Sequence, residues 1–256
     1  MKALILAAGY ATRLYPLTKD KPKPLLKIGD KTIVDYLLTR ISDIKEIDTV
    51  YIVTNKKFYP IFRKWADETN ASKRYPQFQI KVINDGTESN ETRLGAIADI
   101  LFVLNQEQIN DDLLVAAGDN IFCFNFQELK DLFNTHQCDV IVAHRLQDKK
   151  RLQQSGVVEL DENNKVIGFQ EKPQEPQSDF IAPALYIYKK ETLPLFKQYI
   201  DAGENPDAPG SFISWLYKRK PVYAYIMTSQ YYDIGTLESY QAVVKEFEKK
   251  SQDAPC

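Results

Sequence analysis

The 256-residue sequence lacks the features that mark several specialised classes of protein. Its net charge is only −2, so no excess of positive charge would draw it onto nucleic acid or an anionic membrane. No apolar run approaches the roughly 20 residues that cross a bilayer. The first run, at residues 4–8, breaks at Gly9 without a signal-peptide cleavage pattern. We therefore expect neither nucleic acid nor a membrane as a partner.

Cysteine is also scarce. The three cysteines, Cys123, Cys138 and Cys256, are odd in number and lack the spacing of a metal site. This usage suits a reducing compartment. Together with the missing targeting pattern, it makes the cytoplasm the expected location.

What the sequence does contain is a regular alternation of apolar strands and helices. The patterns predict strands at residues 2–7, 49–54, 78–83, 112–117 and 139–144, separated by helices at 33–44, 58–68, 94–104 and 126–135. Such alternation is typical of an α/β fold with a Rossmann-like, mostly parallel sheet flanked by helices.

The second half of the chain has a different sequence pattern. Short strands at 156–160, 165–170, 183–188 and 222–226 predict a mixed-sheet extension. A loop is expected at 202–210 and a helix near 212–219, and a final helix should run from Leu237 to about Lys249.

The loop after the first strand has residue types that suit phosphate binding. Ala7, Ala8 and Gly9 are small enough for the backbone to approach a ligand and to point its amides at phosphate oxygens. Arg13 adds a planar, multi-donor charge, and Lys23 adds a point charge between two prolines. A simple turn would explain the small residues alone, but with these cations close behind, a triphosphate site is the favoured interpretation.

Two aspartates stand at positions that suit a metal. Asp119 follows a buried strand and Gly118, which places it at the carboxyl edge of the predicted sheet, where open α/β folds bind ligands. Asp233 precedes a tight turn and a helix. Two hard oxygen ligands suit Mg²⁺, which takes its remaining ligands from substrate phosphates and water. Either aspartate alone could simply cap a helix.

In order and spacing, these motifs resemble those of the sugar-1-phosphate nucleotidylyltransferases, pyrophosphorylases of GT-A-like fold that include glucose-1-phosphate thymidylyltransferase and UTP-glucose-1-phosphate uridylyltransferase. The family's Gly-x-Gly-Thr-Arg run begins at Gly9, with Ala11 in place of the second glycine, and its Pro-Lys-Pro surrounds Lys23. Its Gly-Asp and Asp-x-Gly motifs match at Asp119 and Asp233. Its Gly-Val-Val and Glu-Lys-Pro motifs match at residues 156–158 and 171–173.

The resemblance implies transfer of a nucleoside monophosphate from a nucleoside triphosphate to a sugar 1-phosphate such as glucose 1-phosphate, with release of pyrophosphate. It assigns catalysis to Arg13 and Lys23, nucleotide binding to Leu6, Ala7, Ala8, Gly9, Thr12, Gly95 and Gly118, acceptor binding to Gly156, Glu171 and Lys172, and Mg²⁺ to Asp119 and Asp233. The chain length makes a single domain over residues 1–256 the default expectation. Its parts are a mainly nucleotide-binding half at 1–145, a mainly acceptor-binding half at 146–236, and a C-terminal helix and tail at 237–256.

Two departures from the family pattern leave the substrates open. Pro183 and Ala184 stand where many relatives carry a small pair ending in glycine, and residues 84–95 lack the glutamine that reads the pyrimidine in many thymidylyl enzymes. The favoured donors are dTTP and UTP.

One alternative keeps the chemistry but uses CTP and a non-sugar phosphate or an unusual sugar phosphate. Another is a non-catalytic nucleotide-sensing subunit, which would not need the metal ligands. A dinucleotide-dependent oxidoreductase is disfavoured because the three-glycine spacing is missing. The chain could be a monomer or a homo-oligomer.

Overall fold

The computed structural model describes residues 1–249, which divide into two compact units. The first unit contains Met1–Arg93, Ala116–Phe126 and the described residues from Ser229 onward. The second contains Leu94–Val115 and Gln127–Thr228. The units therefore alternate along the sequence, and the functional division into consecutive halves stays a prediction.

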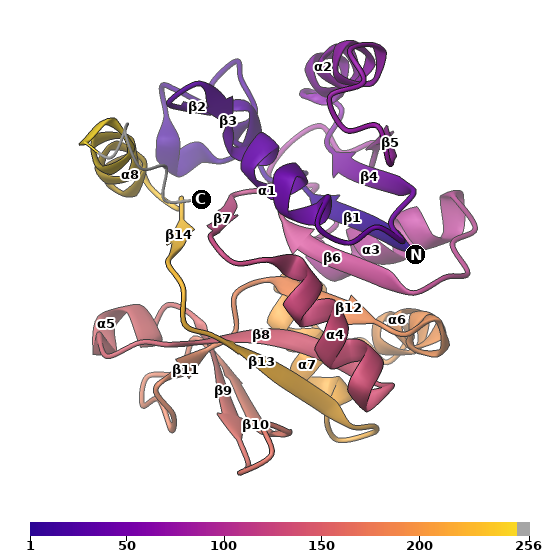
Figure 1. The fold of residues 1–256 in the computed structure, drawn as a ribbon, viewed down its shortest axis with the longest axis vertical. Helices are drawn as coiled ribbons and strands as arrows, with labels where there is room; N and C mark the ends of the chain where they lie inside the picture. Colours follow the sequence, from indigo (N-terminus) through magenta and orange to yellow (C-terminus); the bar gives the residue numbers. More distant parts are fainter. Residues whose placement is uncertain (250–256) are drawn as a thin grey trace. The chain divides into compact units, whose positions relative to one another are not determined.

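The first unit contains three parallel strands in the order β1 (Lys2–Leu6), β4 (Thr49–Thr54) and β5 (Gln79–Asn84) (Figure 1). They are joined through helices α1 (Ile33–Ile41) and α2 (Tyr59–Ala71). Most of the apolar residues of β1 and β4 have no exposed surface, as expected for strands that read as nearly continuous apolar runs. The carboxyl ends of all three strands lie at one edge, so the loops that follow them are neighbours.

Two short strand pairs complete this unit. β7 (Asn120–Phe122) pairs with β14 (Tyr231–Asp233), and β2 (Lys27–Ile28) pairs with β3 (Lys31–Thr32), both antiparallel. One hydrophobic cluster joins these strands to α1 and to the C-terminal helix α8 (Leu237–Lys249), and it is made of Leu14, Leu26, Ile28, Ile33, Tyr36, Ile121, Tyr232, Ile234, Val243 and Phe247. The cluster fixes β14, which ends at Asp233, and β7, which begins directly after Asp119.

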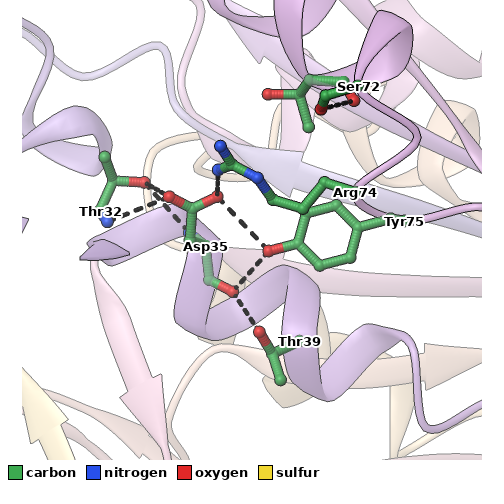
Figure 2. Close-up of polar contacts among 7 residues, drawn as sticks. Thr32, Asp35, Thr39, Ser72, Arg74 and Tyr75 are labelled. Atoms are coloured by element: carbon green, nitrogen blue, oxygen red, sulfur yellow. Dashed lines mark hydrogen bonds and ion pairs between the residues drawn. The ribbon is translucent and has the colours of Figure 1, made fainter. Parts of the chain in front are cut away.

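A polar network anchors the start of α1 (Figure 2). Thr32 and Asp35 form a capping box, which satisfies backbone donors of the first turn. The buried Asp35 carboxylate also accepts from Arg74 Nη1 at 3.0 Å, and the Tyr75 hydroxyl donates to the Asp35 carbonyl at 3.1 Å. Burial raises the pKa of Tyr75 to about 12. The network ties the segment after α2 to the first turn of α1.

The second unit is built around β8 (Asp139–Arg145). This strand pairs antiparallel with β11 (Phe180–Ile181) and β12 (Leu185–Tyr188), and parallel with β13 (Val222–Met227). The hairpin of β9 (Gly156–Leu160) and β10 (Val166–Glu171) joins through β11. The unit's helices are α3 (Ala96–Gln106), nearly all of α4 (Phe126–His136), α5 (Lys149–Leu152), α6 (Leu193–Asp201) and α7 (Pro209–Leu216). Strand β6 (Leu113–Ala117) contains the boundary between the units.

The predicted α/β class and the mixed-sheet extension are confirmed. The prediction was wrong at α7, which begins at Pro209 inside the expected loop and ends three residues early. Proline is favoured in the first turn of a helix because its fixed φ suits that turn and its missing N–H has no partner there. No helix within residues 1–249 is both long and apolar enough to span a membrane.

Candidate active site

The loop after β1 has open space where a ligand could approach. Ala7 and Ala8 are buried, whereas a Cβ atom added to Gly9 would have nothing within 4 Å. Asn55, just past the end of β4, donates from Nδ2 to the Ala8 carbonyl at 2.9 Å, and Thr54 donates to the Ala7 carbonyl at 3.2 Å. These two residues fix the loop, and sequence reasoning missed them. Their position at the end of the neighbouring parallel strand was the available signal.

Ala11 has a backbone conformation that favours glycine. Its φ of 49° and ψ of 40° lie in the left-handed region, which costs a non-glycine residue roughly 1–2 kcal/mol. The buried Thr18 hydroxyl donates to the Ala11 carbonyl at 2.7 Å and so holds this conformation. The short helix η1 (Thr12–Leu14) follows and presents Arg13 to solvent. Arg13 has no acidic partner among residues 1–249, so its guanidinium can bind an anionic ligand.

Lys23 forms an ion pair with Asp119 close to the loop that follows β1. It begins the short helix η2 (Lys23–Leu25), whose backbone is restricted by Pro22 and Pro24. Its ammonium donates to Asp119 Oδ2 at 2.5 Å and to the Ile234 carbonyl at 2.8 Å. A Cβ atom on Gly118 would lie 3.1 Å from the Leu6 carbonyl oxygen, so a larger residue beside Asp119 would require its neighbours to shift by a few tenths of an ångström.

The two predicted metal aspartates come from adjacent segments. Asp233 ends β14 opposite Asn120 of β7, and the Ile234 amide donates to the Asp119 carbonyl at 3.2 Å. Within residues 1–249 no cluster of three or more metal-ligating side chains is present. The donor set fits Mg²⁺ nevertheless, because this ion commonly takes one or two carboxylates together with phosphate oxygens and water. The carboxylate and carbonyl that hold the Lys23 ammonium are hard oxygens of this kind.

A second cluster, in the second unit, surrounds Glu171 at the end of β10. A Cβ atom on Gly156 would lie 2.7 Å from Phe169 Cζ and 3.3 Å from Glu171 Oε2, and one on Gly210 would lie 2.6 and 2.7 Å from the same atoms. The two glycines therefore leave the space that the Glu171 carboxylate occupies. Burial raises the pKa of Glu171, an effect that the neighbouring Lys172 opposes. Lys172 has a φ of 48°, and its ammonium lies 3.9 Å from Glu171 Oε1.

A pocket of about 430 Å³ opens beside the Glu171 carboxylate. Its lining combines donors, acceptors and aromatic rings from Glu171, Tyr199, Glu204, Asn205, Ser211, Ser214, Trp215, Lys218 and Arg219. The Trp215 ring is stacked on the Arg219 guanidinium at 3.5 Å and on the Phe212 ring at 5.9 Å. Protein side chains thus already stack on the Trp215 ring, and the pocket offers a ligand mainly polar groups.

The predicted residues divide into two groups, one in each unit. One, in the first unit, contains Leu6, Ala7, Ala8, Gly9, Thr12, Arg13, Lys23, Gly118, Asp119 and Asp233; the other, in the second, contains Gly95, Gly156, Glu171 and Lys172. The charged residues of the first group suit a nucleoside triphosphate with a metal, and Glu171 and Lys172 suit a hydroxylated phosphate acceptor. Gly95, which was predicted to bind the nucleotide, lies in the second unit. A nucleotidyl transferase family model matches residues 2–250. The chain belongs to the nucleotidyl transferase family.

The chain is similar to curated relatives whose names specify different nucleotidyl groups. It is 30% identical over 207 residues to a glucose-1-phosphate thymidylyltransferase of Neisseria meningitidis, with 77% of this chain and 65% of the relative covered. It is 29% identical over 194 residues to a putative mannose-1-phosphate guanyltransferase of Sulfolobus acidocaldarius, with 75% and 50% covered. The chain thus spans half to about two thirds of the length of these curated relatives. The family resemblance seen in the sequence is confirmed.

Solved structures show the same fold. A UDP-glucose pyrophosphorylase complexed with UDP-glucose superimposes with a TM-score of 0.80 at 21% identity, and 97% of this chain and 98% of that one are covered. A putative glucose-1-phosphate thymidylyltransferase from Bacillus anthracis gives a TM-score of 0.75 at 24% identity, with 96% and 94% covered. The predicted GT-A-like architecture is therefore confirmed. At this level of sequence identity, the two structures support the fold and not the function.

The local packing around Gly95 explains why this residue is glycine. Its φ is 95°, and a Cβ atom there would lie 2.7 Å from the Pro206 carbonyl oxygen. That carbonyl accepts from the Ile97 amide at 2.9 Å, and the Asp207 carbonyl accepts from the Ala96 amide at 3.3 Å. The loop thereby satisfies amides of the first turn of α3. Packing already demands glycine here, so a nucleotide-binding role for Gly95 stays a prediction.

Proposed function

We propose that this nucleotidyl transferase moves a nucleoside monophosphate from a nucleoside triphosphate to a sugar 1-phosphate and releases pyrophosphate. The observation that carries the proposal is the loop at residues 7–13. Open space above Gly9 and an Arg13 with no acidic partner among residues 1–249 accompany the Lys23 and Asp119 ion pair there. Backbone amides, a guanidinium and an ammonium together suit a triphosphate. The first combination to test is dTTP or UTP with glucose 1-phosphate.

In the reaction, an oxygen of the acceptor phosphate attacks the α-phosphorus of the triphosphate. The new bond joins that oxygen to the α-phosphorus, and the bond from the α-phosphorus to the bridging oxygen breaks, so that pyrophosphate leaves with both electrons. The acceptor phosphate is already ionised near neutral pH, so no protein nucleophile is needed. Catalysis then depends on positioning and on stabilising charge.

Each group of residues has a part in this scheme. Arg13 and Lys23 bind and neutralise the triphosphate, and Asp119 and Asp233 would hold Mg²⁺. The bound ion would supply further charge neutralisation at the phosphates. Glu171 accepts hydrogen bonds from acceptor hydroxyls, and Lys172 binds the acceptor phosphate.

The pocket beside Glu171 supports a hydroxylated acceptor over phosphocholine. A quaternary ammonium group is bound best by open aromatic faces, whereas the Trp215 ring is already stacked on Phe212 and Arg219. Sugar hydroxyls both donate and accept, which matches the Glu171 carboxylate, the Ser211 hydroxyl and the other polar groups of the lining.

The proposal is tested by pyrophosphate release in the presence of Mg²⁺. Five common nucleoside triphosphates are crossed with a panel of sugar 1-phosphates and small phosphomonoesters, including phosphocholine. We expect release with a sugar 1-phosphate, and Asp233→Ala should lower turnover by orders of magnitude while leaving the melting temperature nearly unchanged. Turnover only with CTP and a non-sugar phosphate would replace the proposed acceptor. Nucleotide binding without turnover across the panel would favour a sensing subunit.

A further inference from the structure

The Lys23 ammonium occupies a position lined by the kind of oxygen atoms that bind a divalent cation. It donates to Asp119 Oδ2 at 2.5 Å and to the Ile234 carbonyl at 2.8 Å, and the Lys23 side chain is only 12% exposed. Ile234 directly follows Asp233, so the ammonium lies where the two aspartate-bearing segments meet. In the free protein, this ammonium provides the positive charge that Asp119 needs.

We propose that Lys23 blocks the metal site of the free protein, and that its ammonium must leave Asp119 before a divalent cation can bind there at full strength. This inference rests on the proposed function, because it assigns Asp119 to the metal. The two cations compete for one carboxylate oxygen, and they repel each other when both are close to it. The free protein should therefore bind metal weakly.

Binding of the triphosphate would release the Lys23 ammonium from Asp119. Pro22 and Pro24 restrict the backbone around Lys23, whereas its four-carbon side chain can turn about its own bonds. A phosphate bound at the neighbouring loop gives the ammonium a new anionic partner, which frees Asp119 for the metal. Nucleotide and metal should then strengthen each other's binding, as linked equilibria require. Lys23 thus acts as a positioning residue before it acts on the phosphates.

The test is the binding of Mn²⁺, followed by its electron paramagnetic resonance signal, to the full chain without nucleotide. Lys23→Met removes the ammonium but keeps a long side chain, and it should lower the Kd for Mn²⁺ about tenfold, the effect of roughly 1.4 kcal/mol. The matched control is Lys21→Met, because Lys21 is an exposed lysine two residues away. This control should leave the Kd unchanged, and Asp119→Asn should abolish the binding. Thermal melting of each variant reports whether it is folded.

A lower Kd for Lys23→Met alone supports the inference, and so does binding that can be detected only in that variant. An equal or higher Kd for folded Lys23→Met overturns it, as does an absence of detectable Mn²⁺ binding in both proteins. Should Lys23→Met fail to fold, Lys23→Gln is measured under the same criteria. Failure of the proposed function looks different: the metal response to Lys23→Met would be present, but the wild-type protein would turn over no acceptor in the pyrophosphate assay.

Discussion

Breaking the buried ion pair between Asp139 and Lys220 should lower the free energy of unfolding far more than breaking an exposed pair. Asp139 begins β8 with no exposed surface, and its carboxylate accepts from the Lys189 amide at 2.7 Å, from the Thr192 hydroxyl at 2.8 Å and from Lys220 at 3.0 Å. Lys220→Met would leave the two other donors but remove the countercharge. Stranding a buried charge costs roughly 3–5 kcal/mol, and we expect about 3 kcal/mol because those hydrogen bonds remain.

The assay is unfolding by heat and by urea at pH 7.5 and at pH 5. A loss of about 3 kcal/mol corresponds to a fall of roughly 6–12 °C in Tm for a chain of this length. The matched control is Lys197→Met, because Lys197 and Asp201 form an exposed pair whose side chains are 66% and 59% accessible. That substitution should cost only about 0.3–0.5 kcal/mol.

The pH dependence has a definite sign. Burial raises the pKa of Asp139, and Lys220 partly opposes this effect. A carboxyl whose pKa is higher in the folded state contributes stability that is present below its unfolded pKa and is lost as the pH rises through its folded pKa. Removing Lys220 raises the folded pKa further, so Lys220→Met should cost more at pH 7.5 than at pH 5. A cost no larger than that of Lys197→Met, or one that does not change with pH, would refute the reasoning.

Two further predictions address the site. Gly9→Ala should change the free energy of unfolding by less than about 0.5 kcal/mol, because its Cβ would meet nothing within 4 Å, but it should raise the Kd for the triphosphate in a fluorescence titration by filling the space left for the ligand. Unchanged affinity would contradict this. The KM for the acceptor should rise as the pH falls from 8 to 5 while the KM for the triphosphate stays level, because burial raises the pKa of Glu171 and a protonated carboxyl accepts hydrogen bonds less well. Glu171→Gln should flatten this profile, and a parallel change in both KM values would count against Glu171 as the acceptor residue.

The sequence was sufficient to predict an element where a single helical or strand periodicity of apolar residues dominated its segment. The parallel strands β4 and β5 and the helices α1, α3 and α8 lie close to their predicted ranges, because long apolar patterns decide the type of element. The short strands β7 and β14 were missed. Each has only three residues, and each is held by its partner and by the cluster around Phe247 rather than by its own pattern.

The site was predictable only where it uses charged or small residues in a known order. Lys23 and Asp119 lie 96 positions apart in the sequence, and the motifs named both without indicating that they form an ion pair. Asn55 and Gly210 were missed for a different reason. Their roles, holding the Ala8 carbonyl and leaving room for Glu171, appear only once separate segments of the chain are packed together.

The predicted site glycines differ in what would occupy the place of a side chain, and this difference separates function from packing. At Gly95 and Gly156 a Cβ atom would meet protein atoms at 2.7 Å, so the fold itself demands glycine there, whatever the ligand. A Cβ atom at Gly9 would have no atom of the described residues within 4 Å apart from its chain neighbours, and Gly9 is outside the positive-φ region that favours glycine. Neither packing nor backbone strain therefore explains its absent side chain. A ligand that approaches the loop closely, as the proposed function predicts, would explain it. Gly9 is therefore the glycine whose substitution should affect binding without affecting folding, and it tests the phosphate loop more directly than Gly95 or Gly156 can.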